Sequence, residues 1–161
     1  MVFAEHLKTK KKKYNLMTYN HILSLMFNKI IYSELPPKQK EIYNFQKISA
    51  YLADYGFNCI KLSDDWNGAD FLAYHLNGKD TLRIQLKSRI TIDKKYINKN
   101  LHIAFPIDKG WCLIDHDTLV KIVQESTNWL ESASWVENGK YHSATLNKKL
   151  FSLLEPYFSV H

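Results

Sequence analysis

The sequence has 161 residues, of which 45% are hydrophobic and 24% charged, a mix typical of one ordinary globular domain with its own core. No run approaches the roughly 18 consecutive apolar residues that a membrane-spanning helix needs, and no secretory cleavage pattern follows the basic N-terminus. We therefore expect a cytoplasmic protein of a prokaryote or phage, with no membrane partner.

The net charge of +6 favours a polyanionic partner, most simply nucleic acid. Of the 22 basic residues only Arg83 and Arg89 are arginines. Lysine acts as a point charge on phosphate, whereas arginine reads guanine through two hydrogen bonds. The composition therefore predicts contact with the nucleic-acid backbone more than base reading, although an AT-rich coding bias also explains the lysines.

The N-terminal segment differs in composition from the rest of the chain. Residues 1–16 hold a lysine run that is typical of a solvated arm, and apolar residues in 18–31 recur at helical spacing. Pro36-Pro37 then breaks the chain. We predict a basic arm and short helix over residues 1–35 and a core domain over residues 36–161.

The core domain is expected to begin with a helix over residues 38–55 that ends at Gly56. One stripe of this helix is formed by Phe45, Ile48, Leu52 and Tyr55. Glu41 falls within the stripe near the N-terminal end, so its carboxylate is predicted to point to the core-facing side. The alternative is an acid that is favoured there by the helix dipole.

Three strands are predicted next, over residues 57–62, 69–76 and 81–90, with a hairpin turn at 77–80 between the last two. The third strand alternates cleanly. Its apolar side holds Leu82, Ile84, Leu86 and Ile90, and its polar side holds Arg83, Gln85, Lys87 and Arg89.

Two further strands are predicted at 101–105 and 111–114, followed by a helix over 116–125 with Asp115 as its N-cap. Residues 127–142 remain ambiguous between a loop and a short hairpin, and a last helix is predicted over 144–157. This order indicates a mixed α/β sheet with helical cover.

Polar groups on the hairpin suggest phosphodiester chemistry, which needs carboxylates for a metal ion and a cation for developing charge. Counting back from the turn, Asp70 is expected to pair near Lys87 and to lie close to Gln85. Glu41 could close the site. A strand that is apolar on both faces makes an unpaired Asp70 costly, although a polar row of this kind is often only a solvent face.

At these residues the sequence resembles the PD-(D/E)XK nuclease superfamily in a QxK variant, over roughly residues 38–120. The matching stretches are Asn67-Gly68-Ala69-Asp70-Phe71 and Ile84-Gln85-Leu86-Lys87-Ser88-Arg89. The resemblance implies an α/β, restriction endonuclease-like fold with a mixed central β-sheet flanked by helices.

The resemblance also implies roles. Asp70 would bind the metal with help from the Leu86 carbonyl, and Lys87 would position water or stabilise the phosphate. Ser88 and Arg89 would contact the DNA backbone, and we add Arg83, Lys94 and Lys95 as predicted nucleic-acid-binding residues.

Two departures from the superfamily pattern stand out. Its acidic position is Gln85, whose amide oxygen is a weaker ligand for a hard cation, and Glu41 is the candidate that compensates. Residues 92–100 are also too short for the second core helix that many relatives carry.

The expected function is that of a Mg²⁺-dependent endonuclease, with Mn²⁺ as a substitute, that cuts duplex or branched DNA as a homodimer or higher oligomer. It would be of restriction, homing or repair type. Two alternatives stay open: a nuclease-fold DNA-binding module with weak or no catalysis, and a nuclease directed at RNA.

Overall fold

The computed structural model describes residues 27–108 and 110–160, except for the side chains of 65, 66, 159 and 160. The chain divides into two units, Met1–Pro36 and Pro37–His161. The described part of the first unit holds one short 3₁₀ turn, η1 (Tyr32–Glu34). The predicted arm lies outside the described residues, as does most of the predicted 18–31 helix. Residues 27–31, its last five, are not helical.

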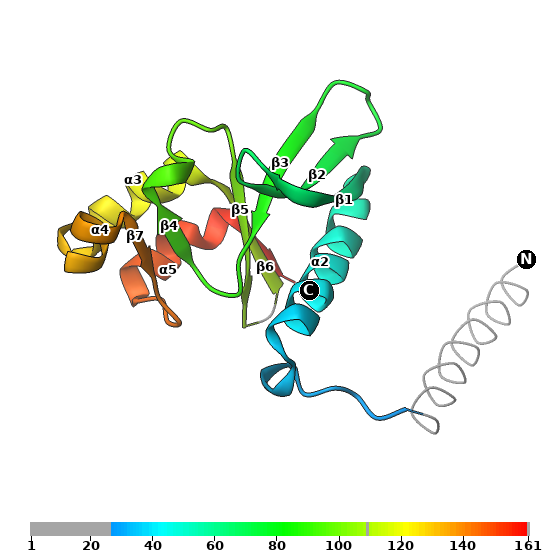
Figure 1. The fold of residues 1–161 in the computed structure, drawn as a ribbon, viewed down its shortest axis with the longest axis horizontal. Coiled ribbons are helices and arrows are strands. Elements are labelled where there is room, and N and C mark those ends of the chain that lie inside the picture. The colour runs from blue at the N-terminus through cyan, green and yellow to red at the C-terminus, as the bar shows by residue number, and fades with distance from the viewer. Residues whose placement is uncertain (1–26, 109, 161) are drawn as a thin grey trace, which may run out of the picture. The chain divides into compact units, whose positions relative to one another are not determined.

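The second unit is a mixed sheet flanked by helices. Its elements are α2 (Pro37–Ala53), β1 (Phe57–Trp66), β2 (Ala69–His75), β3 (Thr81–Leu86), β4 (Thr91–Asp93), η2 (Lys94–Tyr96), β5 (His102–Ile107), β6 (Gly110–Asp115), α3 (His116–Ser126), η3 (Trp129–Glu131), α4 (Ala133–Asn138), β7 (Lys140–His142), α5 (Lys148–Leu154), η4 (Glu155–Tyr157) and β8 (Phe158–Val160). The main sheet has the order β1-β2-β3-β5-β6-β8. Helix α2 lies on one side of it and α3, α4 and α5 on the other (Figure 1). The predicted mixed α/β sheet with helical cover is confirmed.

Only the β3–β5 pair is parallel among the described neighbours in this sheet. The β2–β3 hairpin closes at the predicted turn, where the side-chain oxygen of Asn77 accepts from the backbone N–H groups of Lys79 and Asp80 at 2.9 and 3.1 Å. Such a side-chain bond is the mechanism by which Asn favours turns.

Strand β3 ends at Leu86, four residues before the predicted end at residue 90. The Lys87 N–H donates to the carbonyl of Ala104 at 2.8 Å, and the chain then bends at Ser88 and Arg89. Ile90 therefore packs in a different cluster from Leu86, and the prediction that both share one strand face is wrong.

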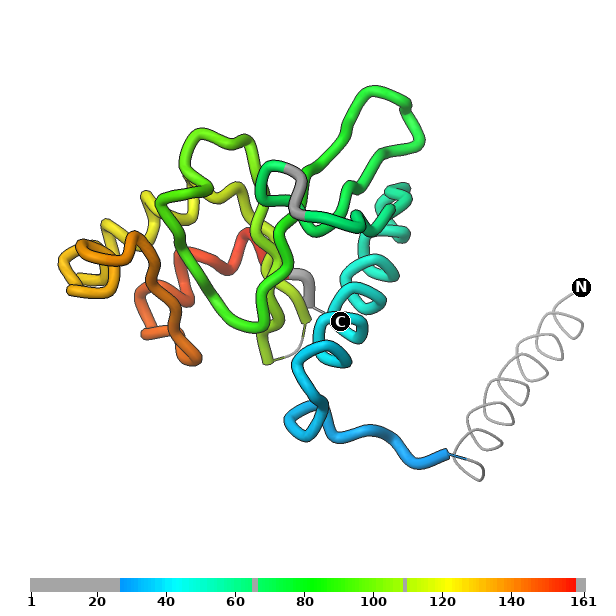
Figure 2. The backbone as a smooth tube through the Cα atoms, viewed as in Figure 1, coloured from blue at the N-terminus to red at the C-terminus, as the bar shows by residue number. Residues whose placement is uncertain are grey.

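After β3 the chain leaves the main sheet and returns only at β5, an excursion that can be followed in Figure 2. Within it, β4 pairs with β7 in a second, two-stranded sheet, and η2 follows directly. No helix longer than the single turn η2 forms between β3 and β5, in line with the short segment expected there.

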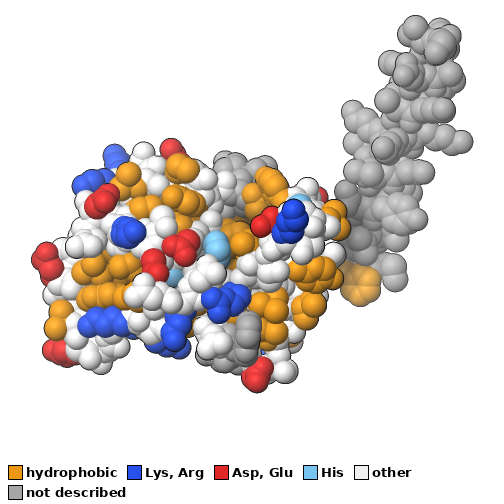
Figure 3. Space-filling view, turned by 90° about the horizontal axis from the view of Figure 1, so that it is seen from above, with side chains coloured by type: hydrophobic (Ala, Val, Ile, Leu, Met, Phe, Trp, Pro, Cys, Tyr) orange, Lys and Arg blue, Asp and Glu red, His pale blue; other side chains and the backbone are white. Residues whose placement is uncertain are grey.

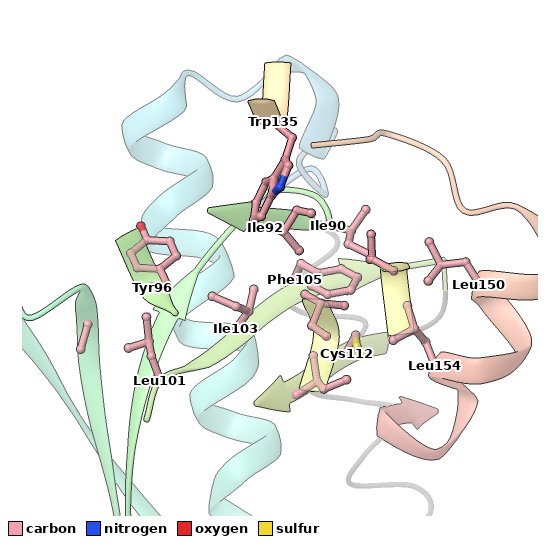
Figure 4. Packing of buried hydrophobic residues seen from close by; sticks show 14 residues of the cluster. Ile90, Ile92, Tyr96, Leu101, Ile103, Phe105, Cys112, Trp135, Leu150 and Leu154 are labelled. Carbon is pink, nitrogen blue, oxygen red and sulfur yellow. The ribbon is translucent and has the colours of Figure 1, made fainter. Parts of the chain in front are cut away.

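Two hydrophobic clusters hold the layers together. One joins α2 to the sheet and consists of Ile48, Leu52, Phe71, Ala73, Ile84, Leu86, Ala104 and Trp111. The larger cluster on the other side includes Tyr96, Ile103, Phe105, Leu119, Trp135 and Leu150, several of which are drawn in Figure 4. The predicted α2 stripe is correct at Ile48 and Leu52 but wrong at Tyr55, which is 58% exposed because the helix ends at Ala53.

The C-terminal elements follow local capping signals. Asp115 accepts from the Thr118 N–H at 2.8 Å and begins α3 as predicted. Asn147 accepts from the Leu150 N–H at 2.8 Å and begins α5 four residues later than expected. Strand β8, which was not predicted, extends the sheet beside β6. None of the described helices is long and apolar enough to cross a membrane.

Candidate functional site

The site begins where β2 and β3 separate. In the antiparallel β2–β3 ladder, Tyr74 lies opposite Thr81 at one end and Phe71 lies opposite Ile84 at the other. Extending this register by one residue puts Asp70 opposite Gln85, so the expected pairing with Lys87 is wrong. Instead, the backbone N–H of Leu86 donates to the Asp70 carboxylate at 2.8 Å, so a side-chain oxygen is the acceptor where a strand pair would use a backbone carbonyl.

Gln85 joins Asp70 to the interior. The residue is 6% exposed, and its amide nitrogen donates to the same Asp70 oxygen that accepts the Leu86 N–H. Its amide oxygen accepts from the Tyr96 hydroxyl at 2.9 Å. A carboxylate can only accept, so Asp70 determines which end of the Gln85 amide faces it.

Lys87 completes the series. Its ammonium donates to the Tyr96 hydroxyl oxygen at 3.1 Å and lies 5.3 Å from the centre of that ring. We call the hydrogen-bonded series Lys87, Tyr96, Gln85 and Asp70 the Asp70 network. Burial lowers the pKa of Lys87, and the nearby charge of Asp70 only partly opposes this effect.

Tyr96 is the member of the network that the sequence did not reveal. It is 2% exposed and comes from η2, where the Asp93 carboxylate accepts the N–H of Lys95 at 3.1 Å. The ring of Tyr96 meets that of His116 edge-on, with centroids 5.5 Å apart. Its one sequence signal is an aromatic residue inside a lysine-rich segment, which is too general to indicate a partner on β3.

Glu41 is held by two lysines. Its carboxylate accepts from Lys61 at 2.6 Å and from Lys38 at 3.0 Å. The hydrogen bond from Lys61 is the main cause of its lowered pKa, with Lys38 second. Glu41 nevertheless lines one cleft of about 300 Å³ together with Lys87, so the structure brings these two predicted site residues to the same opening.

Ser88 and Arg89, two of the predicted nucleic-acid-binding residues, also line this cleft and are exposed. Arg83 is partly buried, and its guanidinium donates to the Lys99 carbonyl. On the face seen in Figure 3, Lys and Arg side chains are separated by acidic and apolar ones. The basic groups of that face therefore do not form one continuous patch.

Lys94 and Lys95 are adjacent but have different surroundings. The Lys94 ammonium donates to the Val136 carbonyl at 3.3 Å and lies 5.4 Å from the centre of the Trp135 ring. The Lys95 ammonium lies 4.8 Å from the centre of the Tyr96 ring. Lys95 is thus the one of the two that stands beside the Asp70 network.

The oxygen atoms at the site are of the type that Mg²⁺ prefers. They belong to the Asp70 carboxylate, the Leu86 carbonyl and the Gln85 amide, although Tyr96 engages the last of these. Across the described part of the chain, three or more His, Cys, Asp or Glu side chains do not gather in a group able to hold a metal. The ligand roles of Asp70, Glu41, Gln85 and Leu86 stay predictions.

Among the comparisons with known proteins, only the search of solved structures found matches, and the similarity is partial. No protein-family model matches the sequence, and a search of curated proteins also found no match. Among solved structures, the chain is similar to Hjc, a Holliday junction resolvase from Archaeoglobus fulgidus, at 15% sequence identity and a TM-score of 0.36. The similarity covers 48% of this chain and 76% of the resolvase.

Proposed function

We propose that this protein is a metal-dependent endonuclease that hydrolyses phosphodiester bonds of DNA. The observation that carries the proposal is the Asp70 network, which links a carboxylate to a partly buried ammonium through two hydrogen-bonding side chains. Hydrolysis of a phosphodiester requires an anionic metal ligand and a cation for the charge that develops on the phosphate. Asp70 and Lys87 supply one of each.

Asp70 and the Leu86 carbonyl are the proposed ligands of a Mg²⁺ or Mn²⁺ ion. Such an ion, when bound, polarises the phosphate and lowers the pKa of a water molecule. Gln85 keeps the Asp70 carboxylate at the end of β3 through its amide nitrogen. Glu41, on the adjoining cleft, is the further carboxylate that we propose for the site.

Lys87 acts in this proposal as a cation. Its bond to the Tyr96 hydroxyl directs the ammonium and leaves two of its three N–H groups for other acceptors. In the cleft beside it, Ser88 and Arg89 are suited to contact the phosphates that flank the bond to be cut.

A second candidate function is DNA binding with weak or no catalysis. Two contacts favour it: the Gln85 amide nitrogen occupies an oxygen of Asp70, and Lys61 and Lys38 neutralise Glu41. Calorimetric titration with Mn²⁺ separates the two functions. Heat of binding that disappears in Asp70→Ala supports the nuclease, whereas intact DNA affinity without metal binding supports the binding module.

We also propose that the active form is a homodimer, because cleavage of both strands of a duplex needs two sites related by a two-fold axis. Sedimentation of the full chain with and without a short DNA duplex tests this. A complex that contains one chain per duplex would contradict it.

The central experiment is cleavage of plasmid and branched DNA by the purified full chain with Mg²⁺, with Mn²⁺ or with a chelator. We expect nicking that needs the metal and is lost in Asp70→Ala and Lys87→Ala. Asp64→Ala removes an exposed carboxylate from the neighbouring strand and serves as the matched control. Circular dichroism of each variant checks that it is folded.

Cleavage that survives both substitutions would rule out the Asp70 network as the active site. Structured RNA is assayed in parallel. Faster cleavage of RNA than of DNA would indicate that RNA is the substrate.

A further inference from the structure

A second cavity, of about 370 Å³, borders the Asp70 network at Tyr96. Its other walls are Asn67, Gly68, Lys95 and Lys99. Two of these five residues are lysines, and no described residue that lines the cavity is acidic. The cavity therefore carries a positive charge that no carboxylate in its walls offsets.

The turn between β1 and β2 presses directly against Tyr96. A Cβ atom on Gly68 would lie 3.0 Å from two carbon atoms of the Tyr96 ring, and its φ of +92° is one that other residues rarely adopt. The positive φ of Gly68 and its tight contact with the ring both favour glycine at this position. The contact makes the turn and the ring one continuous wall.

The loop that carries the lysines is also fixed. The Lys99 N–H donates to the Tyr96 carbonyl at 3.2 Å, and the Lys99 carbonyl accepts from Arg83. The Asn98 N–H donates to the Asp117 carboxylate at 3.0 Å. These bonds hold the backbone of the loop in place, so that the positions of Lys95 and Lys99 at the cavity do not depend on a bound ligand.

The basic residues near the cavity differ in what they contact, and of those that the structure describes only Lys95 and Lys99 line it. Lys94 bonds to the Val136 carbonyl and covers Trp135, and Arg83 bonds to the loop backbone. Both therefore support the fold. The Lys95 ammonium lies over the ring of Tyr96, and Lys99 lines the same cavity.

We propose that the cavity binds a backbone phosphate of the DNA strand, next to the phosphate held at the Asp70 network. Lysine suits this role because it offers a point charge to a phosphate without reading a base. The inference rests on the proposed function for the identity of the strand. A phosphate in the cavity would also offset the charge of Lys95, one of the charges near Lys87.

The experiment measures DNA affinity over a range of salt concentrations, using the full chain and a fluorescent duplex without added metal. The test variant is the double substitution Lys95→Ala and Lys99→Ala. The control is Lys121→Ala with Lys148→Ala, which removes the same charge from exposed positions on α3 and α5. For one lost phosphate contact, the slope of log affinity against log salt should become less negative by about 0.9 in the test variant.

An unchanged slope in the test variant, or an equal change in the control, would overturn the phosphate site. The measurement needs no cleavage, so the two proposals can fail separately. If the wild-type chain cuts DNA but the double variant has an unchanged salt slope, only the phosphate site in the cavity is contradicted. If the double variant has the less negative salt slope but the wild-type chain never cuts DNA, only the nuclease proposal is contradicted.

Discussion

The side-chain amide of Gln85 donates to the carboxylate of Asp70 in a direct hydrogen bond. An amide can bridge a carboxylate and a hydroxyl without any ion, because it offers a donor at one end and an acceptor at the other. A glutamate at the same position has no donor when ionised, and this difference leads to the first prediction.

Gln85→Glu should make the stability of the protein depend on metal. Without metal, a second carboxylate against Asp70 places two like charges together in a buried site, and we expect a lower melting temperature than that of the wild type. Mn²⁺ should restore the melting temperature, because the ion would bind both carboxylates and offset their charges. Thermal unfolding with and without Mn²⁺ checks this, and Gln124→Glu on the exposed face of α3 is the control. A loss that Mn²⁺ fails to reverse would contradict metal binding at Asp70.

Tyr96→Phe should impair both stability and activity while the ring packing is kept. The change leaves the buried oxygen of Gln85 without its donor, which costs about 1–3 kcal/mol in the free energy of unfolding. Lys87 loses its orienting partner, so we expect kcat for DNA cleavage to fall and KM to change little. Urea unfolding and cleavage kinetics measure the two effects. The control is Tyr74→Phe on the exposed part of β2, and equal losses in the two variants would contradict the role of the hydroxyl.

Removing a positive charge near Lys87 should shift the alkaline limit of activity. The pKa of Lys87 is lowered by burial first, and the charges of Lys140 and Lys95 add to this effect. A protonated Lys87 is present below its pKa and is lost as the pH rises through it. Lys140→Ala raises that pKa, so the pH profile of kcat should extend to higher pH, and less so at high salt because salt screens the interaction. If Lys87 acted instead as a neutral base, the rising acidic limb of the profile would move to higher pH and kcat at a given pH on that limb would fall, which would contradict the role of a cation.

Two glycines of the same backbone class should differ in their tolerance of alanine. Gly78 has a φ of +69°, and a Cβ atom added there would have no atom within 4 Å beyond the adjacent residues, so Gly78→Ala should cost only the left-handed strain of about 1–2 kcal/mol. Gly68→Ala adds the collision with Tyr96 and should cost more. Chemical denaturation of the two variants compares them, and equal losses would show that the turn does not press on the ring in solution.

Local signals in the sequence predicted much of the fold. The Asn77 turn determined where β2 meets β3, and Asp115 marked the start of α3. These elements depend on residues within a few positions of one another. Strand β8 could not be predicted in this way, because its three residues form a strand only through pairing with β6.

The part of the candidate site that depends on local sequence could also be predicted. Asp70 and Gln85 belong to one hairpin, whose register places them opposite each other, and Lys87 follows directly after the end of β3. Tyr96 reaches Gln85 only through the path of the chain between β3 and β5, and Glu41 meets Lys61 from a position 20 residues away. Contacts of this kind arise from tertiary packing and leave no periodic signal.

The parallel pairing of β3 with β5 has a consequence for the order of folding. The hairpins on either side of it close over short loops, whereas β3 and β5 can meet only after the whole intervening excursion has been placed. The Lys87 N–H bonds to Ala104 at this junction, and Tyr96 lies within the excursion. We therefore expect protection of the Lys87 amide from hydrogen exchange to appear late during refolding, so that partly folded chains acquire their secondary structure before the Asp70 network is assembled.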